Sequence, residues 1–147
     1  MANHFMQIAL DEAGIAASSG EVPVGAVVVL DGKLVSSAHN RNITNSDPTA
    51  HAEMLAIRKA AEYLGAPRLE ECDLYVTLEP CPMCATAISF ARIRRLYFGA
   101  PDFKGGAVEN GPKIFSQASC FHRPEVIGGI MQDECGEILR AFFRPKR

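Results

Sequence analysis

The sequence predicts an α/β protein, a three-layer α/β/α domain with a central mixed sheet of five strands. Two observations predict this class. Short runs of β-branched residues alternate with segments whose apolar residues recur at helical spacing. An Asp-Gly pair separates the first two of those runs, which is a strong hairpin signal in a chain whose later strands alternate with helices. At 147 residues, we expect one domain over 1–147.

The first third of the chain predicts a helix followed by a hairpin. Residues 3–18 place Phe5, Ala9 and similar side chains at a helical period, and Ser-Ser-Gly ends the pattern. The run Val22–Leu30 is dense in valine and lacks polar alternation, so this strand should be covered on both of its faces. Asp31-Gly32 then turns the chain into a second strand.

A polar loop over 43–48 leads to a second helix. Asp47 or Thr49 is suited to cap this helix, and Pro48 is suited to its start. The helix is expected to run to about Leu64, where a Gly-Ala-Pro sequence stops it.

The remaining elements continue the alternation. In chain order they are a strand over 74–78, a helix from the cysteines through Ala91, a strand over 94–98, a glycine-rich loop over 99–112, a short helix near 114–115, a strand at 126–127 and a helix over 130–143. Helix starts at the carboxyl ends of strands are where sites of α/β proteins lie.

Composition narrows the functional classes. The formal net charge of −2 argues against a general nucleic-acid coat protein, which would be strongly basic. No apolar stretch is long enough to span a bilayer, and the N-terminus does not read as a signal peptide. Five cysteines are an odd number and fit a reducing cytoplasm, with Cys72, Cys120 and Cys135 as ordinary thiols in or near the core.

Three residues form a candidate metal site. His51, Cys81 and Cys84 are imidazole and thiolate ligands of the kind zinc takes, and a catalytic zinc site uses three protein ligands and leaves one position for water. Pro82 suits a first helical position, so both cysteines should lie at a helix N-terminus, where free N–H groups favour thiolates.

Glu53 is the candidate proton carrier of this site. A carboxylate beside a water activated by zinc can accept and deliver protons. Glu79 is the other acidic residue within the motif segments. Two alternatives stand beside this interpretation: a purely structural zinc site, and a redox pair formed by the C-x-x-C sequence.

The C-terminal segment is rich in cations and aromatic residues. Arg140, Arg144, Lys146 and Arg147 form either a basic patch or a solvated helix end whose cations suit the helix dipole. Phe142 and Phe143 are adjacent and cannot share a helix face, so one packs and the other either packs too or stacks on a base.

Several blocks of the chain resemble the bacterial tRNA-specific adenosine deaminases of the cytidine-deaminase-like zinc superfamily, over nearly the whole length. The superfamily signature H-x-E followed by P-C-x-x-C is present as His51–Glu53 and Pro80–Cys84. The other blocks that resemble the family are Glu21–Val27, Asn40-Arg41, Asp47–Glu53, Leu74–Cys81 and the end Phe142–Arg144. In the loop before that end, Gly99-Ala100, Asp102, Lys104 and Gly106-Ala107 resemble the family's substrate loop.

The resemblance implies a zinc-dependent hydrolase, a homodimer with one zinc ion per subunit. It implies hydrolytic deamination of adenosine to inosine at the wobble position of an arginine tRNA anticodon loop. By resemblance His51, Cys81 and Cys84 hold zinc, and Glu53 shuttles the protons. The implied substrate-binding residues are Asn40, Asp102, Lys104, Phe142, Phe143 and Arg144.

One departure and two rivals remain. Where the family often has Asn-His-Arg, this chain has Phe121 before the His-Arg pair, so an RNA contact made by that asparagine is lost or replaced. The main rival is a zinc deaminase of a free base or nucleoside, such as guanine or cytosine/cytidine, because the zinc motif is shared. The other rival is a non-catalytic RNA- or partner-binding module with a structural zinc.

Overall fold

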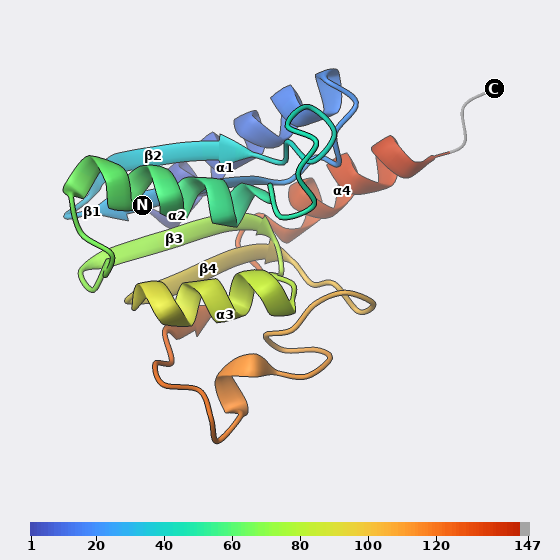
Figure 1. The fold of residues 1–147 in the computed structure, drawn as a ribbon. Helices are drawn as coiled ribbons and strands as arrows, with labels where there is room; N and C mark the ends of the chain where they lie inside the picture. The colour runs from blue at the N-terminus through green and yellow to red at the C-terminus, as the bar shows by residue number, and fades with distance from the viewer. Residues whose placement is uncertain (145–147) are drawn as a thin grey trace.

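The computed structural model describes residues 1–144 of the 147-residue chain, so Lys146 and Arg147 of the predicted basic patch lie outside the described residues. Five strands form one mixed sheet in the order β2-β1-β3-β4-β5 (Figure 1). The bounds are α1 Ala2–Ser18, β1 Gly25–Leu30, β2 Lys33–His39, α2 Ala52–Leu64, β3 Cys72–Leu78, α3 Pro82–Ala91, β4 Arg95–Ala100, the 3-10 helix η1 Ile114–Ser116, β5 Glu125–Ile127 and α4 Gln132–Phe143.

The sheet is mixed because its two halves are connected differently. β1 pairs antiparallel with both β2 and β3, whereas β3, β4 and β5 are parallel neighbours. The predicted hairpin is confirmed: Asp31 and Gly32 both have positive φ, at 51° and 73°, and Leu30 pairs with Lys33. Positive φ at both central residues gives the turn whose twist matches the flanking strands.

Helices cover both faces of the sheet, as the sequence predicts. α2 and α3 lie on one face, and α1 and α4 lie on the other (Figure 1). The valines of β1 alternate between the two cores: Val28 is buried with α2 and α3, and Val27 and Val29 are buried with α1. The strand begins at Gly25 rather than at Val22, because the preceding proline segment does not join the ladder.

The predicted start of the second helix is wrong. α2 begins at Ala52 with His51 at its N-cap, and neither Asp47 nor Thr49 caps it. The Asp47 carboxylate instead accepts hydrogen bonds from the amide and hydroxyl of Thr49, at 2.8 and 2.7 Å. Pro48 therefore lies in the loop before the helix. The predicted stop is confirmed, since Gly65 ends α2 in the left-handed conformation at φ 67°.

The other predicted elements are confirmed within a few residues of their ends. All five cysteines are free thiols, with Cys72 and Cys135 buried and Cys120 half-buried. Within residues 1–144, none of the helices is long and apolar enough to cross a membrane.

Candidate metal centre and active site

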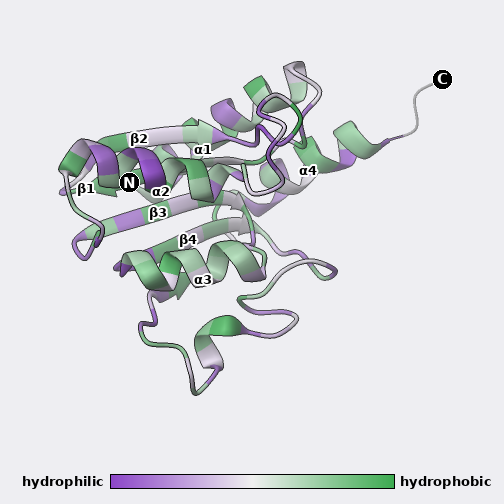
Figure 2. Ribbon diagram, viewed as in Figure 1, coloured by the Kyte–Doolittle hydropathy of each residue, from purple (hydrophilic) through white to green (hydrophobic). Residues whose placement is uncertain are grey.

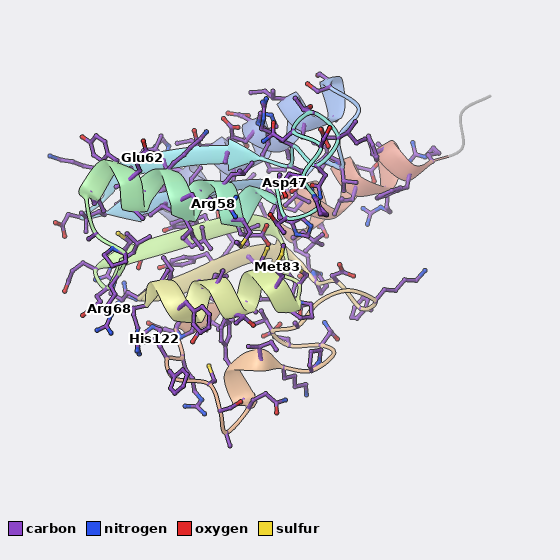
Figure 3. All side chains as sticks on the ribbon, in the orientation of Figure 1. Asp47, Arg58, Glu62, Arg68, Met83 and His122 are labelled. Carbon is purple, nitrogen blue, oxygen red and sulfur yellow. The ribbon has the colours of Figure 1, made fainter. Side chains whose placement is uncertain are left out.

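Two helix starts meet at one end of the sheet. α2 follows the loop after β2, and α3 follows β3 directly, so both helices begin at the same end (Figure 1). His51 is the N-cap of α2 and Cys81 is the N-cap of α3, both with extended backbone. Pro82 is the first helical residue of α3, as predicted. In Figure 3, Asp47 and Met83 lie near these two helix starts, and Glu62 lies at the opposite end of α2.

The structure brings the three predicted ligands together. The ligand atoms of His51, Cys81 and Cys84 all lie within 4.8 Å of one another. His51 Nδ1 lies 3.6 Å from Cys81 Sγ and 3.5 Å from Cys84 Sγ. Tetrahedral zinc, with its usual bond lengths to sulfur and nitrogen, separates such atoms by about 3.6 Å. The donor set and its spacing therefore fit a zinc ion.

The two sulfurs differ in their surroundings. Hydrogen bonding from Cys84 and from His51 lowers the pKa of Cys81 to about 4, against the opposing effect of burial. The pKa of Cys84 is raised, first by its interaction with Cys81 and then by burial. Cys81 is thus the readier thiolate, and binding of a cation releases the proton that Cys84 retains.

Glu53 lies in the first turn of α2 and is only 4% exposed. Burial raises the pKa of this carboxyl to about 7. A carboxyl group that titrates near neutrality can both accept and donate a proton at working pH. Glu53 lines the same cavity of about 630 Å³ as His51 and Cys81, so it faces the metal site.

Asn40 lies at the end of β2, 9% exposed, in the wall of this cavity. Its side-chain oxygen accepts a hydrogen bond of 2.8 Å from the backbone N–H of Ala52, the first residue of α2. The amide is therefore not free to accept from a ligand with that lone pair. The side-chain nitrogen of Asn40 makes no hydrogen bond within residues 1–144. Its N–H groups are therefore available to donate to a ligand in the cavity.

Glu79 is a buried acidic residue of the motif segments, and the sequence predicts no role for it. The side chain is 2% exposed, between β3 and Cys81. Burial opposes its ionisation, but hydrogen bonds from Asp102 and Asn110 and their neighbours outweigh burial and lower its pKa. Glu79 is thus an acceptor for the loop after β4 and differs from Glu53, whose pKa is raised.

Asp102 and Lys104 lie in that loop. The Asp102 carboxylate accepts hydrogen bonds from the backbone N–H groups of Lys104 and Gly105, at 3.1 and 2.9 Å. It therefore shapes a turn, and it also lines the cavity. The Lys104 side chain is exposed.

The end of α4 separates the two phenylalanines as predicted. Phe142 is half-buried and lines the cavity, whereas Phe143 is 64% exposed. A second hollow of about 620 Å³ adjoins the first and contains Phe143, Lys104 and Arg140 in its lining. The Arg140 and Arg144 guanidinium groups pair with Glu137 at 3.1 and 3.3 Å, so the described part of the basic patch is a solvated helix end with paired cations.

Comparisons with known proteins agree with this geometry. Residues 1–100 match the family model described as the cytidine and deoxycytidylate deaminase zinc-binding region. The chain is 59% identical to a tRNA-specific adenosine deaminase of Agrobacterium fabrum, over 98% of this chain and 95% of the relative. It is 46% identical to a tRNA-specific adenosine deaminase of Bacillus subtilis, over 97% and 89%.

Two solved structures mark the range of similarity. One, from a study of A-to-I editing by tRNA:A34 deaminases at the wobble position of transfer RNA, superposes with a TM-score of 0.92 at 58% identity, over 92% of this chain and 99% of that chain. A guanine deaminase from Bacillus subtilis superposes with a TM-score of 0.64 at 30% identity, over 98% and 96%.

Proposed function

This chain belongs to the tRNA-specific adenosine deaminases, within the cytidine and deoxycytidylate deaminase zinc-binding family, and we propose that it hydrolyses adenosine to inosine at the wobble position of an arginine tRNA. Water replaces the amino group at C6 of the base, and ammonia leaves. The observation that carries the proposal is the set of His51, Cys81 and Cys84 around one point, with buried Glu53 in the same cavity.

His51, Cys81 and Cys84 hold one zinc ion per subunit. Zinc, when bound, supplies Lewis-acid chemistry and lowers the pKa of a water molecule. The 3.5 and 3.6 Å approaches of the two sulfurs to His51 Nδ1 support this ligand set. With three protein ligands, one position remains for the reacting water, which distinguishes this site from a closed structural zinc site.

Glu53 moves the protons. It accepts a proton from the attacking water and delivers it to the ring nitrogen beside C6, and then it assists the departure of ammonia. A pKa near 7 suits a group that performs both steps. Its burial keeps bulk water from competing for the proton, and its position in the first turn of α2 places it beside His51.

The target base enters the cavity only after it leaves the stack of the anticodon loop. The free amide nitrogen of Asn40 donates to the base, and the oxygen of the same amide is held by Ala52. This fixed oxygen orients the donor. Phe142 and Leu78 supply apolar walls on which a purine can pack.

Residues of the second hollow bind the RNA beside the flipped nucleotide. The two hollows share Val22, Leu78 and Asp102, so a chain leaving the first hollow passes directly into the second. Phe143 offers an exposed ring for base stacking. Lys104, in the lining of the second hollow, offers a cation for phosphates, and so does Arg144, which follows Phe143 at the end of α4.

The free-base rival is less well supported. The guanine deaminase match has 30% identity, against 59% for the Agrobacterium fabrum tRNA enzyme, over a similar share of this chain. The exposed Lys104 and Phe143 lie outside the cavity that would enclose a single base. A free base does not need them.

The enzyme acts as a homodimer that joins through the outer side of α2 and α3. Figure 2 colours α3 as apolar along nearly its whole length. Met54, Met83 and Phe90 line one shallow hollow on this side, and Phe90 is 67% exposed. Phe121, at 79% exposure, lies with Phe90 at the next hollow, so the departure from the family motif adds to this apolar surface.

The compartment we infer is the cytoplasm. Its thiol-reducing conditions suit a protein whose five cysteines are free. It is also where a tRNA substrate is available, and thiolate ligands such as Cys81 stay reduced there.

The test is deamination of an arginine-tRNA anticodon stem-loop with adenosine at the wobble position, run beside free adenosine, cytidine and guanine. Inosine at that one position, with the free compounds untouched, supports the proposal. Turnover of a free base with an intact stem-loop contradicts it and supports the rival.

A further inference from the structure

The buried Glu79 carboxylate is the centre of a network that no step of the reaction uses. Oε1 accepts hydrogen bonds from the Asp102 amide at 3.0 Å and the Asn110 side chain at 2.8 Å. Oε2 accepts from the amides of Val108, Glu109 and Asn110, at 3.1, 2.9 and 3.0 Å. Five donors from one loop thus converge on one carboxylate.

The backbone on either side of this carboxylate is bound to the same loop. The Glu79 N–H donates to Ala100 O at 2.9 Å, and Pro80 O accepts from the Ala107 N–H at 2.9 Å. Cys81 follows immediately. The loop over 101–113 leaves β4 and is therefore attached to the segment that delivers the first cysteine to α3 (Figure 1).

The loop approaches the carboxylate closely at Gly106. A Cβ atom built on Gly106 would lie 2.6 Å from the Glu79 Cδ atom and 2.4 Å from Asp102 O. Only a glycine permits this approach. Any larger residue at position 106 would therefore displace the loop from the carboxylate.

We propose that Glu79 is a positioning residue, whose carboxylate holds the 101–113 loop in the conformation that binds the RNA substrate. It acts through Asp102 and Lys104 and does not touch the reacting atoms. This inference rests on the proposed function, since it assigns the loop the role of an RNA-binding wall. The loop is preformed, so binding does not need to order it.

A carboxylate is required because all five partners are donors. In Glu79→Gln the shape is kept, but the amide NH₂ would face N–H groups of the loop whichever way it is turned. Buried donors would lose their acceptor. Aspartate would be too short to reach both sets of donors.

A second buried acid in the lining of the cavity shows the same arrangement. Glu21, 2% exposed, accepts from the amides of Ile43 and Thr44 at 3.2 and 2.7 Å and from the Thr44 hydroxyl at 2.8 Å. Both Glu21 and Glu79 line the 630 Å³ cavity. Two different loops beside the cavity are thus each held by a buried carboxylate.

The experiment compares Glu79→Gln, the milder Asn110→Ala and the control Glu125→Gln in the full chain. Glu125→Gln makes the same substitution at an exposed residue of β5, whose carboxylate pairs with Arg95 away from the cavity. Measured quantities are zinc per chain, amide hydrogen exchange of 102–110, and kcat and KM for the stem-loop. Asn110→Ala removes one donor only, so it reports on the network if Glu79→Gln folds poorly.

We expect Glu79→Gln to keep zinc and to lose exchange protection in 102–110, while β3 and α3 stay protected. KM for the stem-loop should rise between about tenfold and 100-fold, with a smaller change in kcat. Asn110→Ala should also raise amide exchange in 102–110 and KM for the stem-loop, but by smaller amounts. Glu125→Gln should match wild type in both quantities.

Unchanged exchange and unchanged KM in Glu79→Gln would overturn the proposal. Loss of zinc with KM unchanged would also overturn it, since Glu79 would then serve the metal site alone. If the wild-type chain does not deaminate the stem-loop, the proposed function fails. Exchange in 102–110 still reports separately whether Glu79 holds the loop.

Discussion

The floor of the cavity and its rim are built in opposite ways. The floor is formed by His51, Glu53, Cys81 and Cys84, with Cys84 fully buried and Glu53 4% exposed. The rim is formed by Phe103, Lys104 and Phe143, which line the second hollow, together with Arg144, which follows Phe143 in the chain. In the rim, Phe103 is 80% exposed and Phe143 64%, and the Arg144 side chain is 65% exposed.

This difference separates chemistry from recognition. Floor residues are fixed by two helix starts, so their geometry exists before any substrate binds, and preorganised groups lose nothing to reorganisation during reaction. Rim residues are exposed, and although Arg144 pairs with Glu137, we expect their side chains to contact the RNA. We therefore expect floor variants to lower turnover and rim variants to weaken binding.

Removal of a floor ligand should have the largest effect. Cys84→Ser replaces a thiolate with a hydroxyl that zinc binds poorly, so metal content should drop far below one ion per chain and activity should reach background. Elemental analysis of the purified variant measures this directly. Full zinc occupancy in Cys84→Ser would contradict the ligand assignment.

Removal of the proton carrier should have the next largest effect. Glu53→Ala should keep zinc and the fold but lower kcat by about 10³-fold or more, because proton transfer and water activation fail together. Steady-state kinetics on the stem-loop, with KM measured in parallel, gives the result. Activity within a factor of ten of wild type would refute the proposed role of Glu53.

A rim aromatic should show the opposite pattern. Phe143→Ala removes a stacking surface worth about 1–3 kcal/mol per base, so KM should rise roughly tenfold while kcat at saturation stays near wild type. Ile15→Ala is a control, because Ile15 is a half-exposed apolar residue of α1, on the opposite face of the sheet from α2 and α3, and it does not line the cavity. An equal rise of KM in both variants would argue against stacking by Phe143.

A rim cation should have the smallest effect. Lys104→Ala removes one phosphate contact, so binding should weaken several-fold and the salt dependence of log K should lose about one unit of slope. Binding titrations of the stem-loop at several salt concentrations measure both. An unchanged slope would show that Lys104 does not contact the backbone of the RNA.

Much of the floor could be predicted from sequence because its signals are local. Cys81, Pro82 and Cys84 lie within one helical turn, and the Asp31-Gly32 hairpin is fixed by two residues. The cap of α2 was mispredicted, because Asp47 is held by Thr49 two residues away and the amide of Ala52 is taken by Asn40 from across the site.

The loop anchors could not be predicted, because their partners are distant in sequence. Glu79 accepts from donors 23 to 31 residues away, and Glu21 from donors 22 and 23 residues away. The H-x-E signature marks Glu53, but nothing in the local sequence marks Glu21 or Glu79 as the anchor of a loop. The signal was burial of the carboxylate, which only the fold reveals.

The division between floor and rim is tested most directly by the single-turnover rate of inosine formation at saturating stem-loop. We would compare Glu53→Gln with the double variant Lys104→Ala/Arg144→Ala. The double variant should react at nearly the wild-type rate once saturated, and Glu53→Gln should react at least about 10³-fold more slowly. A double variant that stays slow at saturation, or a Glu53→Gln enzyme within tenfold of wild type, would contradict the division.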